Sequence, residues 1–132
     1  MQTQITFQTD AFSPVANDTI NAPNRYGKKL ATWLAGELPK HGITVNDCYA
    51  EDWGWEIAID NPAFPLYLGC GNLDDDGFTC FITPDVPTVR LLKHLFRKTD
   101  TRPAVGKLAT ALDAILRSHP RISAIAWQDK SP

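Results

Sequence analysis

Lysine and arginine are missing from the middle of this chain. Neither occurs from residue 43 to residue 86, although this stretch carries nine carboxylates. Residues 87–132 are the opposite, with nine basic and three acidic side chains, so the net charge of −2 conceals two regions of opposite sign. Such an asymmetry concerns surfaces and partners rather than the fold. The nine carboxylates are Asp47, Glu51, Asp52, Glu56, Asp60, Asp74, Asp75, Asp76 and Asp85.

Cysteine and long apolar runs are also scarce. The three cysteines are an odd and sparse set, which argues against a disulfide-built secreted domain, and the absence of a C-x-x-C pair argues against a zinc knuckle. Cys70 and Cys80 could face each other across a hairpin, where we expect them to remain thiols. No run approaches the roughly 20 apolar residues of a membrane span, and the first residues lack the pattern of a signal peptide. We therefore expect a cytoplasmic protein that does not associate with membranes.

The chain has the size and composition of one domain. It has 132 residues, of which 43% are hydrophobic, and it contains no repeat or low-complexity linker. A chain of this length buries roughly two-thirds of its unfolded surface and needs no covalent staple. We expect residues 1–132 to form a single domain.

Three segments have helical periodicity. The first should be capped by Asn21 or Asn24, with Pro23 in its first turn and Gly42 after its end. The second should lie around residues 90–97, and the third should begin near Pro103 and end at His119. The expected apolar stripes are Tyr26, Leu30, Trp33, Leu34 and Leu38 in the first, Leu91, Leu92, Leu95 and Phe96 in the second, and Val105, Leu108, Leu112, Ile115 and Leu116 in the third.

The remaining segments alternate as strands. These are residues 3–8, 43–49, 53–60, 64–70, 78–82 and 121–127. The turns between the middle strands are too short for crossover connections, so these strands must be antiparallel neighbours. The prediction is an α+β fold, with an antiparallel sheet of about five to six strands and three helices packed on one face.

Two glycine-rich segments, Glu51-Asp-Trp-Gly-Trp and Gly69-Cys-Gly-Asn, stand out in the strand region. Glycine inside a strand indicates a close approach of backbone or ligand, so a groove could lie between these segments. Trp53 and Trp55 could form its wall. They share their parity with Ile57 and Ile59, however, which favours burial of both rings in the core.

Four motifs together resemble a family of small uncharacterised bacterial proteins. They are Asn24-Arg-Tyr-Gly-Lys-Lys-Leu-Ala-x-Trp-Leu, Glu51-Asp-Trp-Gly-Trp, Leu68-Gly-Cys-Gly-Asn and Thr101-Arg-Pro. The resemblance spans most of the chain and implies a bacterial, cytosolic, single-domain protein. It brings no established activity, substrate or cofactor.

The sequence completes no metal or cofactor motif. The loop from Asn72 to Gly77 matches the first half of a calcium loop, but position twelve is Thr83 rather than the bidentate glutamate. A hairpin turn explains the same residues better. The basic residues from Arg90 to Lys98 could contact phosphates, yet the sequence pI of about 5.8 argues against nucleic acid as a partner. We expect no metal and no cofactor.

Three functional interpretations remain open. The first is a non-catalytic protein-binding module, immunity-protein-like or regulatory, whose acidic sheet face holds a basic partner. The second is a salt-sensitive homo-oligomer in which acidic and basic surfaces meet. The third is an enzyme or small-ligand protein with a site between the two glycine-rich segments, using Glu51, Asp52, Tyr67 or Cys70. We favour the first, with a binding surface that comprises Asp52, Glu56, Asp60, Asp74, Asp75 and Asp76, and with Trp53 or Trp55 as aromatic anchors.

Overall fold

The computed structural model describes residues 2–16, 18, 24–73, 76–85 and 100–129. Six strands and two α-helices account for most of them. In chain order the elements are β1 Gln2–Thr9, α1 Lys28–Glu37, the 3₁₀ helix η1 Leu38–His41, β2 Val45–Glu51, β3 Gly54–Ile59, β4 Leu66–Asn72, β5 Gly77–Pro84, α2 Arg102–Ser118 and β6 Ile122–Asp129.

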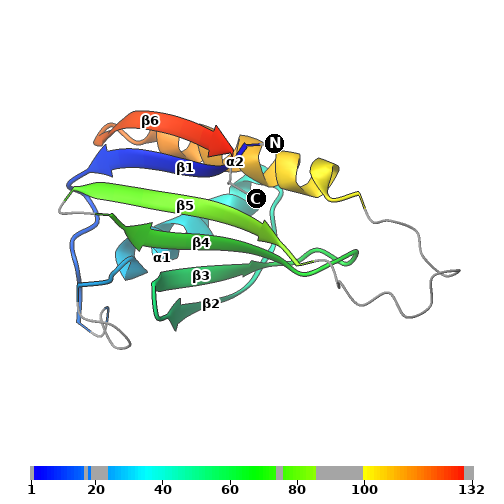
Figure 1. Ribbon diagram of the computed structural model, residues 1–132, viewed down its shortest axis with the longest axis horizontal. Helices are drawn as coiled ribbons and strands as arrows, with labels where there is room; N and C mark the ends of the chain where they lie inside the picture. Colours follow the sequence, from blue (N-terminus) through cyan, green and yellow to red (C-terminus); the bar gives the residue numbers. More distant parts are fainter. Residues whose placement is uncertain (1, 17, 19–23, 74–75, 86–99, 130–132) are drawn as a thin grey trace, which may run out of the picture.

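The strands form one antiparallel sheet in the order β2-β3-β4-β5-β1-β6. Figure 1 shows α1 and α2 behind this sheet, on the same face. The α+β class and the antiparallel sheet are thus confirmed. The prediction of three helices is not: the described residues contain two α-helices, and the helix expected around residues 90–97 lies outside them.

Strand alternation divides the sheet into a covered face and an uncovered one. Ile5 pairs with Cys80, Cys80 with Cys70, and Leu68 with Ile57, and all of these side chains are fully buried beneath the helices. The helices supply the other half of the core through buried leucines such as Leu34 and Leu112. Burial of these apolar side chains is the main stabilising contribution to the fold.

Helix α2 corresponds to the third predicted helix and agrees closely with its predicted pattern. Pro103 lies in its first turn, and the helix ends at His119. Proline is accommodated at a helix start because the first amides have no intrahelical acceptor. The predicted apolar stripe is buried throughout, namely Val105, Leu108, Leu112, Ile115 and Leu116.

The start of α1 differs from its prediction. The helix begins at Lys28, and Asn24, with a φ of 65°, precedes it without capping it. The side chain of Asp18 accepts the free amides at the helix start instead. The predicted end is confirmed, because Gly42 adopts a left-handed φ of 79° and closes η1. None of the helices in the described residues is long and apolar enough to span a membrane.

Candidate functional site

The sheet face opposite the helices carries the candidate site, and we call it the open face. One row of side chains crosses it in the register Gln4–Phe81–Gly69–Glu56–Tyr49. Within the described residues no helix covers this face. None of the six strands contains a lysine or an arginine. The open face is therefore a sheet surface whose charges are negative.

Three carboxylates surround Tyr49 at the β2 end of the open face. Asp47 and Glu51 share the parity of Tyr49 in β2, and Glu56 is its partner in β3. The Tyr49 hydroxyl donates a hydrogen bond of 2.6 Å to the carboxylate Oε2 of Glu56. This hydrogen bond, followed by burial and by the charges of Glu56 and Glu51, raises the pKa of Tyr49 well above its ordinary value. The tyrosine thus stays protonated and acts as a donor beside the carboxylates.

An aromatic pair lies next to Glu56 on the same face. The ring of Phe81 leans over Gly69, where a side chain would collide with it. Trp53 packs on Phe81 with ring centroids 4.9 Å apart, and it remains 36% exposed. The glycine thus permits an aromatic surface directly beside a carboxylate.

The two tryptophans, which sequence parity assigns to the same side, lie on opposite faces. Trp53 belongs to the turn between β2 and β3, so strand alternation does not govern it. Trp55 is within β3, packs against the core and donates from Nε1 to Asp18 at 2.9 Å. The expectation that both rings point inward is therefore wrong for Trp53.

The other predicted acidic residues lie around the open face rather than on it. Asp52 and Asp60 are exposed at opposite ends of β3. Asp76 is exposed in the β4–β5 connection, and Asp74 and Asp75 lie outside the described residues. Of the predicted residues that the structure describes, Glu56 and Trp53 alone meet on the open face. Asp47, Glu51, Tyr49 and Phe81 join them, and the bounds and register of β2 and β5, rather than a sequence motif, decide this placement.

Residues from three of the four motifs meet at the start of α1, where the buried Asp18 joins them. The carboxylate Oδ1 of Asp18 accepts hydrogen bonds of 2.9 Å from the amides of Gly27 and Lys28 and from the Trp55 indole. Its Oδ2 accepts from the Val15 amide at 3.3 Å. Asp18 is 4% exposed and fully engaged. It positions α1 against β3 and has no free oxygen for chemistry.

Asn72 connects the same junction to β4. Its side chain accepts from the Tyr26 amide and donates to the Asn24 carbonyl, each at 3.0 Å. A Cβ atom at Gly27 would lie 2.9 Å from the Cys70 carbonyl oxygen, and one at Gly54 would lie closer still. These glycines allow the backbones to come into direct contact. The space between the two glycine-rich segments is therefore filled by backbone atoms, and no groove separates them there.

The residues considered for an enzyme site do not converge. Glu51 and Tyr67 face the open side, Asp52 lies in a turn, and the fully buried Cys70 faces the helices. The buried Asn72 amide is committed to residues 24–26, which leaves the partial calcium loop without its first ligand. Among the described residues, no three histidine, cysteine or acidic side chains are arranged to hold a metal ion.

No protein-family model, curated protein or solved structure matches this chain.

Proposed function

We propose that this protein is a non-catalytic binding module whose open face holds a basic polypeptide. The observation that carries the proposal is the composition of this face. It combines Asp47, Glu51 and Glu56 with exposed aromatic surface, on a sheet whose strands contain no lysine or arginine. We place the interaction in a bacterial cytoplasm, where an immunity-like or regulatory role would suit a small domain of this kind.

The charge distribution favours a cationic partner. A surface with one sign of charge accelerates the encounter with a partner of the opposite sign and disfavours partners of like sign. The exposed carboxylates at the rim, including Asp52 and Asp76, extend the negative potential beyond the sheet face. We call Asp47, Glu51 and Glu56 the central carboxylates, because they surround the proposed binding centre at Tyr49. We expect the rim to affect mainly the rate of association and the central carboxylates to affect the lifetime of the complex.

The aromatic groups favour arginine-containing partners. Trp53 is held against Phe81, so it offers a large surface with little conformational entropy left to lose. A guanidinium group can stack on such a ring while it donates hydrogen bonds to a neighbouring carboxylate. Glu56 is that neighbour, because its strand partner Gly69 lies beneath the Phe81 ring.

Two variants with equal charge change test the proposal. The first replaces the central carboxylates, as Asp47→Asn, Glu51→Gln and Glu56→Gln. The control replaces three exposed carboxylates that lie outside the strand row of the open face, as Asp52→Asn, Asp76→Asn and Asp85→Asn. The probe is a synthetic peptide of alternating arginine and threonine, measured by calorimetry at low and high salt. A peptide with citrulline in place of arginine lacks the positive charge and serves as the control ligand.

We expect the first variant to bind the arginine peptide at least about tenfold more weakly than the wild type, and the control variant to lose about threefold or less. High salt should weaken wild-type binding. Equal loss in both variants, or equal affinity for the citrulline peptide, would refute the proposal. Sedimentation of the protein alone tests the alternative of self-association: a salt-sensitive oligomer that the first variant abolishes would identify a second copy as the partner.

A further inference from the structure

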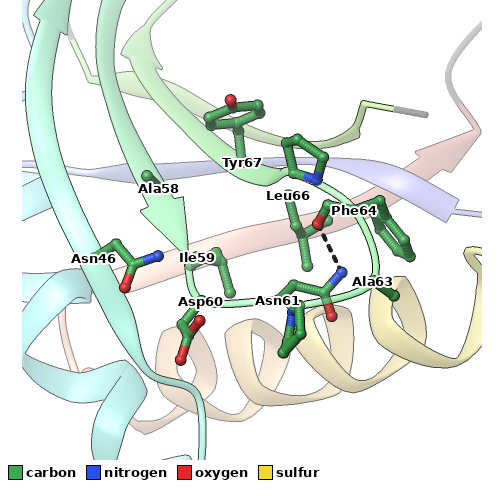
Figure 2. A pocket seen from close by; sticks show the side chains of 11 residues that line it. Asn46, Ala58, Ile59, Asp60, Asn61, Ala63, Phe64, Leu66 and Tyr67 are labelled. Atoms are coloured by element: carbon green, nitrogen blue, oxygen red, sulfur yellow. Dashed lines mark hydrogen bonds between the residues drawn. The ribbon is translucent and has the colours of Figure 1, made fainter. Parts of the chain in front are cut away.

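A pocket of about 420 Å³ lies where the β3–β4 connection faces the edge strand β2. Its size is within the range of about 300–1,000 Å³ that is usual for ligand sites. The apolar part is formed by Ile59, Phe64 and Leu66, which are 3–6% exposed. Asn46, Asp60 and Tyr67 provide polar groups around it. In Figure 2 the side chains of Asn46 and Asp60 lie on the side of the pocket opposite Phe64.

Hydrogen bonds hold the walls of the pocket in place. The Asn61 side chain donates to the Phe64 carbonyl at 2.9 Å, across the turn that Figure 2 shows. The backbone amide of Asp60 donates to the Thr44 carbonyl oxygen, and the amide of Asp85 donates to the Pro65 carbonyl oxygen, both at 2.8 Å. The connection is thus fixed on both sides before any ligand arrives, which lowers the entropic cost of binding.

The pocket has the charge of a cation site. Asp60 is its charged lining residue, and no lysine or arginine lines it. Lys107 lies on the other side of the Ile59–Asn61 segment, in a separate hollow of about 120 Å³ that Asp60 also borders. No ion pair joins Lys107 to Asp60 in the described part of the chain. The Asp60 carboxylate is therefore available to a ligand.

The pocket is continuous with the open face. Ala58 and Tyr67, which line it, are strand partners with the parity of the open face. Asp47, one of the central carboxylates, pairs with Ala58 on the other side. A polypeptide that crosses the open face would pass the mouth of the pocket, so one of its side chains could enter.

We propose that the pocket binds an arginine side chain of the basic partner, an inference that rests on the function proposed above. The aliphatic stem would lie on Ala58 and the Tyr67 ring, since long basic side chains bury their stems on apolar surface. The guanidinium would donate to Asp60 and Asn46, whose side chains lie on the same side of the pocket. Arginine suits this site better than lysine because its planar group has five donors for two acceptors, one on β2 and one in the β3–β4 connection.

Heteronuclear NMR of the isotope-labelled full chain tests the assignment. The probe is N-acetyl-arginine methylamide, and the lysine and citrulline derivatives are the controls. We expect the arginine derivative to bind in the millimolar range and to shift the amide signals of Asn46, Ala58 and residues 60–67. Asp60→Asn should weaken this binding about fivefold, whereas Asp10→Asn, the same change after β1 at the opposite end of the sheet, should leave it unchanged.

Each other outcome would overturn the assignment. Equal binding of the citrulline derivative would show that charge is not recognised, and equal binding of the lysine derivative would remove the preference for guanidinium. Shifts confined to Tyr49 and Glu56 would place the cation elsewhere. Tyr67→Ala provides a second variant: it removes the ring on which the stem would lie, so it should also weaken binding.

The pocket and the open face can fail separately. If the arginine–threonine peptide binds the wild type and Asp60→Asn equally well, the pocket assignment is wrong and the proposed function stands. If the arginine derivative binds in the pocket but the peptide shows no dependence on Asp47, Glu51 and Glu56, the proposed function is wrong and the guanidinium site stands without its polypeptide.

Discussion

The hydroxyl of Tyr49 donates a 2.6 Å hydrogen bond to the carboxylate of Glu56 across the β2–β3 pair. Both side chains lie on the open face, between the edge of the sheet and the Trp53–Phe81 pair. The hydrogen bond aligns the Glu56 carboxylate and keeps the tyrosine neutral, so the group that we propose as the centre of the binding surface has a defined orientation.

This hydrogen bond predicts a pH dependence at alkaline pH. Glu56 raises the pKa of Tyr49 above its ordinary value of about 10, because the phenolate would lose the hydrogen bond and face a carboxylate. The raised pKa contributes stability that is complete below about pH 10 and is lost as the pH rises through the folded-state pKa. The effect should be small, below about 1 kcal/mol, because Tyr49 is partly exposed.

Alkaline titration followed by phenolate absorbance measures this directly. We expect Glu56→Gln to lower the Tyr49 pKa towards about 10, with Tyr49→Phe identifying which part of the absorbance change belongs to this residue. An unchanged titration in Glu56→Gln would contradict the hydrogen bond.

Asp18 predicts a large stability effect far from the open face. Asp18→Ala removes the acceptor of four donors, and the burial of the site keeps water from replacing it. Loss of a helix cap together with unsatisfied buried donors should lower the free energy of unfolding by about 3 kcal/mol. Urea denaturation measures this change.

Two further variants separate the contributions at this site. Trp55→Phe removes only the indole donor and should cost about 1 kcal/mol. Asp18→Asn keeps one acceptor oxygen and should fall between the two. If Asp18→Ala were as stable as the wild type, the carboxylate would not be the cap of α1.

The regular elements could be predicted because local patterns determine them. The stripe from Val105 to Leu116 has one helical period, and the alternation through Ile57 and Ile59 has one strand period, so burial follows from spacing alone. Gly42 ends its helix through a backbone conformation that only the local chain decides.

The junction at α1 and the composition of the open face depend on tertiary structure. Asp18 lies nine residues before the amide of Gly27 that it accepts, beyond the range in which capping signals can be read. Trp53 escapes its predicted parity because a turn, not a strand, contains it. The carboxylates that gather around Tyr49 were visible as charges, but only the register of β2 against β3 decides which of them share a face.

The three cysteines should differ in reactivity. Cys70 is fully buried, and its hydrogen bond with Cys80 and its burial raise the thiol pKa well above the ordinary value. Cys48 is partly exposed, and burial together with the charge of Asp47 raises its pKa as well. At neutral pH we expect an alkylating reagent to modify Cys48 slowly and the other two only when the protein unfolds.

Mass spectrometry of the intact protein should accordingly show one adduct under native conditions and three in urea. Cys48→Ser should abolish the native adduct. A native adduct on Cys70 at a rate similar to that on Cys48 would mean that the Cys70–Cys80 region opens far more readily than its burial indicates.

Two glycine-to-alanine substitutions should have opposite signs. Gly54 has a φ of 151°, and a Cβ atom there would collide with the Cys70 carbonyl oxygen, so Gly54→Ala should destabilise the protein by about 2–4 kcal/mol. Gly106 lies within α2 with nothing within 4 Å of an added Cβ, so Gly106→Ala should stabilise by up to about 1 kcal/mol through helix propensity. Urea denaturation of both variants measures the difference. If Gly54→Ala did not change the free energy of unfolding, Gly54 and the Cys70–Gly71 backbone would not be in the tight contact that the structure shows.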